Sequence, residues 1–177
     1  MCIRDSVKDA NRSLTRIVEE GAATLAAGPA QRPQRPRPLR VAIRLVNGRK
    51  PINSAYTGKV FGGPTIGPDS PPTWTADVAA KYPNGVRFTG EGFPDVTPCS
   101  LADVKVLGLI GNRAVDAGLA NEALAKELRL GSVPQTPESY LWHHVEDGTT
   151  MMLVAEDLHS AVRHIGGGAV ITGGSGR

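Results

Sequence analysis

The chain has 177 residues, of which 40% are hydrophobic, with 21 glycines, 14 prolines and a formal net charge of +3. This length suits one ordinary domain with some tail, and the glycine and proline content predicts a loop-rich domain. The mild positive charge is compatible with a polyanionic partner but does not indicate one by itself. The two cysteines form no CxxC pair, which excludes a zinc ribbon and a redox pair. No apolar run is long enough to span a membrane in the visible chain.

The first segments in chain order are expected to lie outside the main domain. Residues 1–6, Met-Cys-Ile-Arg-Asp-Ser, resemble the translated end of a sequencing-library transposon, so we expect an artefact here and a native protein that extends further upstream. Apolar residues at helical spacing predict a helix over residues 7–27, as the tail of an upstream region. Residues 28–40 carry four prolines and four arginines and predict an extended linker, with a nucleic-acid-gripping arm as the alternative.

Residues 41–177 are expected to form one small mixed α+β domain. A short strand is predicted over residues 41–46, ending in a turn at Asn47-Gly48. Residues 51–75 have many glycines and prolines and no clear period, so they are expected to be loop with one short strand near residues 56–61.

The middle of the domain combines short extended pieces with one helix. Residues 82–98 are expected to form turns and short extended segments, and residues 104–110 predict an apolar strand. Residues 113–130 predict a helix that ends at Gly131. The apolar residues expected near one face of this helix are Val115, Leu119, Ala123, Leu124 and Leu128.

The last part of the domain predicts a β-hairpin followed by a helix. Two strand candidates, residues 139–145 and 150–154, flank an Asp147-Gly148 pair, which is a strong hairpin-turn signal. Asp157 is expected to cap a helix over residues 158–164, which the glycines that follow would end.

All four histidines of the chain lie in this hairpin and helix: His143, His144, His159 and His164. Three imidazoles with an open position make a catalytic site for zinc or another divalent metal, and a fourth histidine can take a proton from water. Adjacent strand residues point to opposite faces, so His143 and His144 reach one site only at a bulge or strand end. Helix positions five apart differ by about 140°, so His159 and His164 converge only if the helix ends near Arg163. The spacing thus predicts a metal site, against chance or a structural metal as alternatives.

The histidines belong to a set of short sequence blocks. These are Tyr140-Leu141-Trp142-His143-His144, Thr150-Met151-Met152-Leu153-Val154, Asp157-Leu158-His159 and His164-Ile165-Gly166-Gly167. The blocks resemble the WHH family of the HNH/endonuclease VII nuclease superfamily, whose members include C-terminal domains of bacterial polymorphic toxins related to colicin-like DNases. Weaker matches upstream, among them Gly111-Asn112-Arg113 with Asp116, extend the resemblance over roughly residues 52–168.

The resemblance implies a ββα-metal unit at residues 139–168 and a role for each histidine. The first residue of the pair, His143, would bind the metal, and His144 would be the general base. His159 would be the next ligand, and His164 a third ligand or a phosphate contact. The cofactor would be one divalent ion, which is Mg, Zn or another transition metal.

Three further positions follow from this comparison. Arg163 could clamp a phosphate in the transition state, with a solvent-exposed salt bridge as the alternative. The Asn that braces the loop in HNH nucleases is absent between the histidine pairs, so Asp147 or the backbone would brace it. Ile165 stands where the family has Thr, which removes a hydroxyl from that corner.

Together these features predict a metal-dependent endonuclease that hydrolyses phosphodiester bonds of DNA in preference to RNA. We expect it to act as the C-terminal domain of a toxin or bacteriocin that is secreted or delivered into a target cell's cytoplasm, with a cognate immunity protein as partner. The alternatives are an HNH endonuclease outside a toxin, and a catalytically dead metal finger that binds nucleic acid without cutting it.

Overall fold

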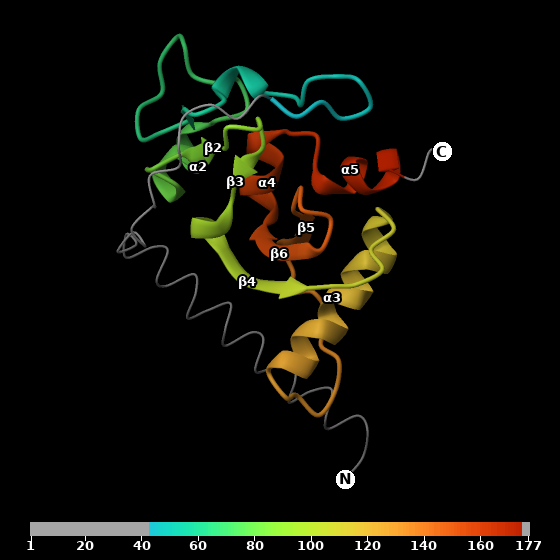
Figure 1. Ribbon diagram of the computed structural model, residues 1–177. Helices are drawn as coiled ribbons and strands as arrows, with labels where there is room; N and C mark the ends of the chain where they lie inside the picture. The colour runs from blue at the N-terminus through green and yellow to red at the C-terminus, as the bar shows by residue number, and fades with distance from the viewer. Residues whose placement is uncertain (1–42, 175–177) are drawn as a thin grey trace.

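The computed structural model describes residues 43–174 of the chain (Figure 1). The predictions for residues 1–6, 7–27 and 28–40 lie outside the described residues, and the domain boundary at residue 41 stays a prediction. Over residues 43–174, no helix has the length and apolar character needed to cross a bilayer.

The centre of the fold is an antiparallel three-stranded sheet in the order β4-β6-β5. Its strands are β4 (Ser100–Lys105), β5 (Tyr140–His144) and β6 (Thr150–Ala155). Helix α3 (Arg113–Glu127) packs on one face, and α4 (Glu156–Val162) packs on the other. The α+β class and the predicted hairpin-plus-helix unit, β5-β6-α4, are therefore confirmed.

Strand β6 shows why two layers form around this sheet. All its residues except Met152 are buried, and they alternate between the two faces. Met151 and Leu153 pack in the cluster that contains α3 residues, whereas Val154 packs in the cluster that contains α4 residues. A strand that is apolar on both faces must be covered on both, and this places β6 at the middle of the sheet.

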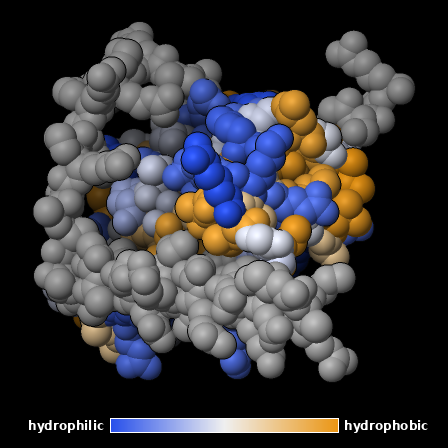
Figure 2. All heavy atoms as spheres, turned by 90° about the horizontal axis from the view of Figure 1, so that it is seen from below, coloured by the Kyte–Doolittle hydropathy of each residue, from blue (hydrophilic) through white to orange (hydrophobic). Residues whose placement is uncertain are grey.

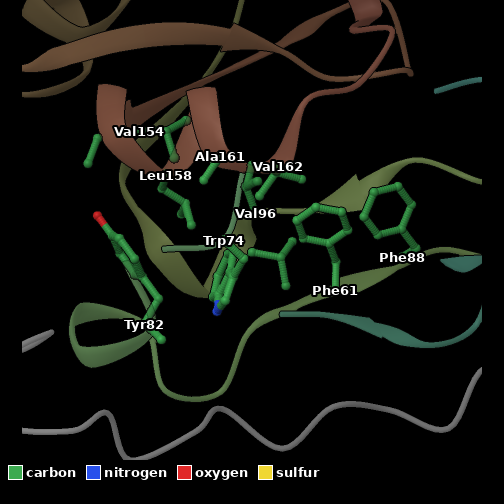
Figure 3. Close-up of a cluster of buried hydrophobic side chains, with 12 residues drawn as sticks. Phe61, Trp74, Tyr82, Phe88, Val96, Val154, Leu158, Ala161 and Val162 are labelled. Carbon is green, nitrogen blue, oxygen red and sulfur yellow. The ribbon is translucent and has the colours of Figure 1, made fainter. Parts of the chain in front are cut away.

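A second, smaller sheet packs against α4. It is antiparallel, in the order β1-β2-β3, and consists of β1 (Val60–Phe61), β2 (Val86–Phe88) and β3 (Pro94–Asp95). The short helix α2 (Ala76–Lys81) and the 3-10 turns η1 (Ser54–Tyr56) and η2 (Thr97–Cys99) complete this part. Figure 3 shows its aromatic side chains, among them Trp74 and Phe61, meeting Leu158 and Val162 of α4. The last helix, α5 (Gly167–Gly174), follows α4 and contacts β5.

Two strand predictions are corrected. Residues 43–45 form no strand, because no neighbouring strand pairs with them; the turn at Asn47-Gly48 forms and is closed by a Val46–Arg49 bridge. The strand expected over residues 104–110 corresponds to β4, which begins four residues earlier, at Ser100, and ends at Lys105. The apolar run continues beyond it as a loop in which Leu107 is 88% exposed.

The helix predicted over residues 113–130 forms, but its end and its buried face differ. It ends at Glu127 with Leu128 as its C-cap, and Arg129, not Gly131, turns the chain away with a φ of 53°. The buried face follows Asp116, Ala120 and Leu124, with Leu119 and Ala123 partly buried beside it, whereas the predicted Val115 and Leu128 are exposed. A prediction from apolar periodicity misses a buried helix face when one of its positions is an acidic residue.

The helix predicted over residues 158–164 is α4, which begins and ends two residues earlier. Its N-cap is Ala155, and Asp157 lies in the first turn instead of capping it. Asp157 accepts hydrogen bonds from Tyr82 Oη and Lys81 Nζ, at 2.9 and 2.7 Å, and so ties α4 to α2. The helix stops before the glycines, which begin α5 instead.

The surface is mixed in character. Seen from below, hydrophilic and hydrophobic residues lie side by side where the face is described (Figure 2). Several large apolar side chains on the described part are exposed, including Ile110, Val115, Leu128 and Val133.

Candidate active site

The paired histidines lie at the end of β5, where they point to opposite faces of the sheet. His143 pairs with Met152 and His144 with Met151 on β6. His143 faces α4 and contacts its histidine ring, whereas His144 faces α3. β5 ends at His144 as expected, but the two imidazoles do not converge on one site, and they have different surroundings.

On the α4 face, His143, His159 and His164 come together. One ring nitrogen from each lies within 4.8 Å of the others. The ring centroids are 4.8 to 5.5 Å apart, with His143 at the bottom of the cluster and 3% exposed. These residues come from β5, from α4 and from the loop after it, so the cluster exists only in the folded chain.

The donor set fits a divalent metal ion. His143 Nδ1 and His164 Nε2 are 3.2 Å apart. Two nitrogens bound to one tetrahedral ion at about 2.1 Å would be about 3.4 Å apart. In addition, His164 Nδ1 is buried without a hydrogen-bond partner among the described residues. A buried ring nitrogen without a partner is costly, and an ion bound at Nε2 would leave that cost in place, so the fit rests on the spacing of the two ring nitrogens.

The electrostatics keep these imidazoles neutral, which is the form that binds metals. Burial lowers the pKa of His143 well below its ordinary value, and the neighbouring histidines lower it further. Burial, and then the charges of Arg113 and His144, lower the pKa of His159 to about 4. Burial and His159 lower the pKa of His164 to about 3.

The end of α4 brings His164 back to the cluster. The helix stops at Val162, and Arg163 has a φ of 28° and a ψ of 105°, outside the helical region. The expected break near Arg163 is therefore confirmed, although the glycines do not make it. Asn53 donates from Nδ2 to the carbonyls of Val162 and Arg163, at 2.9 and 2.6 Å.

On the opposite face, His144 is held by a carboxylate. His144 Nε2 lies 2.7 Å from Asp116 Oδ2, with Asp116 0% and the His144 side chain 10% exposed. The backbone N–H groups of Ile110 and Gly111 donate to the same carboxylate, at 3.1 and 2.8 Å. Asn112 caps α3 through the N–H groups of its first turn, which fixes the helix end that carries Asp116.

The charge state of Asp116 assigns the tautomer of His144. Burial alone would raise the pKa of Asp116, but the hydrogen bonds from His144, Ile110 and Gly111 outweigh it and the pKa is lowered. An ionised carboxylate only accepts hydrogen bonds, so His144 Nε2 must donate. The lone pair of a neutral His144 is then on Nδ1, the nitrogen that can accept a proton.

Helix α5 lies close to His144 because its first residues are glycines. A Cβ on Gly167 would lie 2.1 Å from the carbonyl oxygen of Val145, which no side chain permits. Gly168 lies beside the imidazole, since a Cβ there would be 3.7 Å from His144 Nδ1. The glycines predicted to end α4 thus serve a different purpose, which is to let α5 pack against the end of β5.

Asp147 braces the hairpin between the two strands, as expected in place of the missing Asn. Its Oδ1 accepts from the N–H groups of Thr149 and Thr150, and its Oδ2 from Lys105 Nζ at 2.7 Å and from the Thr150 hydroxyl.

Trp142 is 3% exposed, and its Nε1 donates to Asn121 Oδ1 at 2.8 Å, which makes it a core residue that fixes the strand beside His143.

Two arginines lie near the site. Arg163 is exposed and forms no ion pair within residues 43–174, so its guanidinium is available to a ligand. Arg113, the first residue of α3, is close enough to His159 to lower its pKa. Sequence reasoning gave no role to Arg113, to Asn53 or to Asp116, although Asp116 was among the weaker matches to the WHH pattern.

The comparison with known families agrees with this geometry. Residues 134–174 match the model of the family described as WHH, a nuclease of the HNH/ENDO VII superfamily with conserved WHH. The chain contains that triplet as Trp142, His143 and His144. No curated protein matches the chain. The C-terminal part of this protein, residues 134–174, is therefore similar to nucleases of the WHH family.

Proposed function

We propose that the protein is a metal-dependent endonuclease that hydrolyses phosphodiester bonds, with DNA as the preferred substrate. One observation carries the proposal. A cluster of three neutral histidines lies on one side of β5, and the next residue of the strand is a histidine whose proton-accepting nitrogen is set by a buried carboxylate.

The three-histidine cluster supports a catalytic metal over a structural one. Structural zinc sites are closed by four protein ligands, whereas catalytic sites use three and keep one position for water or substrate. The group formed by His143, His159 and His164 has three members among residues 43–174. A closed, non-cutting metal finger is therefore less well supported than an enzyme.

The roles of the residues follow from their surroundings. His143, His159 and His164 would hold the ion, which when bound supplies positive charge to a phosphate oxygen and to the leaving group. His144 is the last residue of β5, so we propose that it accepts at Nδ1, around the end of the strand, a proton from the water that attacks a phosphate at the cluster. Asp116 would keep Nε2 as the donor and stabilise the imidazolium that results, as the carboxylate of a hydrolase triad does.

Arg163 completes the proposed site from the solvent side. Its exposed guanidinium follows α4 directly and lies next in sequence to His164. A planar guanidinium binds two oxygens of a phosphate at once, so Arg163 would hold the phosphodiester over the histidine cluster.

This chemistry does not require a ribose 2′-hydroxyl, because water supplies the nucleophile. DNA is therefore a competent substrate, which agrees with the resemblance to colicin-like DNases. By the same resemblance we propose that the domain is the toxic part of a larger protein, secreted or delivered into a target cell and neutralised in its producer by an immunity protein.

The direct test is cleavage of plasmid DNA and of total RNA by the purified chain, with Mg²⁺, Mn²⁺, Ni²⁺ and Zn²⁺ in turn after treatment with a chelator. We expect no cleavage without metal and nicked, then linear, plasmid with at least one ion. Equal cleavage of plasmid in the presence and absence of chelator would contradict the proposed metal site, and cleavage of RNA alone would contradict the preference for DNA.

A further inference from the structure

The histidine cluster depends on a contact that lies far from it in the sequence. His164 belongs to the cluster only because the chain leaves α4 at Val162 and turns at Arg163. The last carbonyls of a helix have no partner inside the helix and need donors from elsewhere. In this protein the donors come from the upstream part of the domain.

Two side chains supply these donors. Asn53 Nδ2 binds the carbonyls of Val162 and Arg163, at 2.9 and 2.6 Å. Thr73 Oγ1 donates to the carbonyl of Ala161, at 2.5 Å. Three successive carbonyls at the end of α4 are thus bound by residues at least 88 positions away.

Both donors are themselves firmly placed. Asn53 takes the left-handed conformation, with φ of 62°, as the residue before η1, and its carbonyl accepts from the N–H of Tyr56 at 2.9 Å. Thr73 precedes Trp74, which is 2% exposed and donates from Nε1 to the carbonyl of Gly63 at 2.9 Å. Figure 3 shows Trp74 in the aromatic cluster that also contacts Ala161 and Val162.

The geometry points to a positioning role for Asn53 and Thr73: by capping the end of α4, they hold the turn at Arg163 that places His164 in the metal cluster. His159 and His164 are five positions apart, and a continuous helix would carry His164 about 140° away from His159 around its axis. The positive φ of Arg163 is a conformation that L residues rarely adopt, so the turn needs outside support.

This inference rests on the proposed metal site, and it adds that the segment matching the WHH family is not self-sufficient. Asn53 and Thr73 lie upstream of residues 134–174, so the family segment supplies the three histidines and the upstream segment supplies their alignment. Removing a group that orients a metal ligand typically lowers the metal affinity about tenfold to a hundredfold.

The test is calorimetric titration of the full chain with Zn²⁺ alone. Asn53→Gly keeps the positive φ and deletes the amide, and Asn53→Asp keeps the shape but replaces the donor with an acceptor. We expect both to weaken Zn²⁺ binding about tenfold or more. Asn47→Gly is the matched control, because Asn47 is also an asparagine at positive φ and, within residues 43–174, forms no hydrogen bond to α4; it should leave the affinity unchanged.

A double-mutant cycle separates positioning from a general loss of structure. In a His164→Ala background, Asn53→Gly should change the Zn²⁺ affinity by less than about twofold, because the residue it positions is gone. The same tenfold loss in that background would overturn the inference. Thr73→Val should weaken binding, whereas Thr73→Ser, which retains the hydroxyl, should restore it; equal affinities for these two variants would remove Thr73 from the account.

A second readout is independent of metal. In the metal-free chain, the imidazole signals of His164 in a long-range ¹H–¹⁵N spectrum should move in Asn53→Gly while those of His144 stay in place. If the parent chain binds no divalent ion but His164 moves, the proposed metal site fails and the positioning role stands. If the parent binds Zn²⁺, and Asn53→Gly changes neither the His164 signals nor the Zn²⁺ affinity, the positioning role fails and the metal site stands.

Discussion

The two faces of the central sheet place the same residue type in opposite electrostatic surroundings. On the α4 face, three histidines lie together, the described part of the chain adds no carboxylate to their cluster, and their pKa values are lowered. On the α3 face, His144 is bound to the ionised Asp116. Neutral imidazoles with free lone pairs suit metal binding, and an imidazole beside a carboxylate suits proton transfer. The surroundings, more than the residue type, divide the roles.

The largest expected effect comes from removing a ligand on the α4 face. His159→Ala should lower the cleavage rate by about a thousandfold or more, since a bound metal ion contributes several kcal/mol to transition-state stabilisation. It should also abolish the rise in melting temperature on adding metal. Ser160→Ala, at the exposed neighbouring position of α4, is the control and should behave as the parent. Normal cleavage by His159→Ala would remove this histidine from the site.

The second effect is a loss of stability at low pH in the metal-free chain. The folded pKa values of His159 and His164, about 4 and about 3, lie below the ordinary value of 6.5. The unfolded chain therefore binds more protons as the pH falls through 6.5, and the fold loses stability from there down to about pH 4 for His159 and about pH 3 for His164. At pH 5.5 the loss should be about 1 kcal/mol per histidine.

Thermal denaturation of chelator-treated protein between pH 7.5 and 4.5 measures this loss. The slope should decrease in His159→Ala, because one of the depressed histidines is gone. A melting temperature that rises as the pH falls from 7 to 5 would contradict the neutral state of the cluster.

On the α3 face, Asp116→Asn should separate proton transfer from metal binding. The change keeps the shape of the side chain but removes the charge that stabilises the imidazolium of His144. We expect cleavage to fall about a hundredfold, at the lower end of the range that general-base catalysis contributes. Zn²⁺ affinity should stay within about twofold of the parent, because Asp116 lies across the sheet from the cluster. Loss of metal affinity with unchanged turnover would reverse the assignment of the two faces.

The smallest expected effect concerns the exposed edge of the site. Arg163→Ala should raise KM for plasmid about threefold to tenfold with little change in melting temperature, because an exposed phosphate contact contributes modestly. Arg163→Lys should recover part of the loss. Arg129→Ala tests another exposed arginine at positive φ, at the end of α3, and should leave KM unchanged. Equal effects of the two alanine variants would indicate a general charge effect.

The sequence predicts the parts of the site that depend on local spacing. The alternation around an Asp147-Gly148 turn predicts β5 and β6, and the opposite orientations of His143 and His144 follow from the twofold period of a strand. The separate roles of the two histidines were implied only by the resemblance to the WHH family. The break at Arg163 follows from the need of His159 and His164 to converge. These inferences succeed because each uses residues that are near one another in the chain.

The parts that escape prediction depend on contacts between distant residues. Asp116 reaches His144 across 28 positions, and Asn53 reaches Arg163 across 110. Asp116 also interrupts the apolar face of α3, so the hydrophobic pattern assigns the buried face to its neighbours. The short helix α2 was not predicted, because its six residues carry no clear period and its cap at Thr75 lies among prolines and glycines.

The central claim is that the adjacent histidines His143 and His144 have different functions because they face opposite sides of the sheet. Titration of Zn²⁺ into His143→Ala and into His144→Ala, each paired with a plasmid-cleavage assay, tests it most directly. The account predicts that His143→Ala loses both metal binding and cleavage, whereas His144→Ala binds Zn²⁺ as the parent does and fails to cleave. Equal loss of metal affinity in both variants, or normal cleavage by His144→Ala, would contradict it.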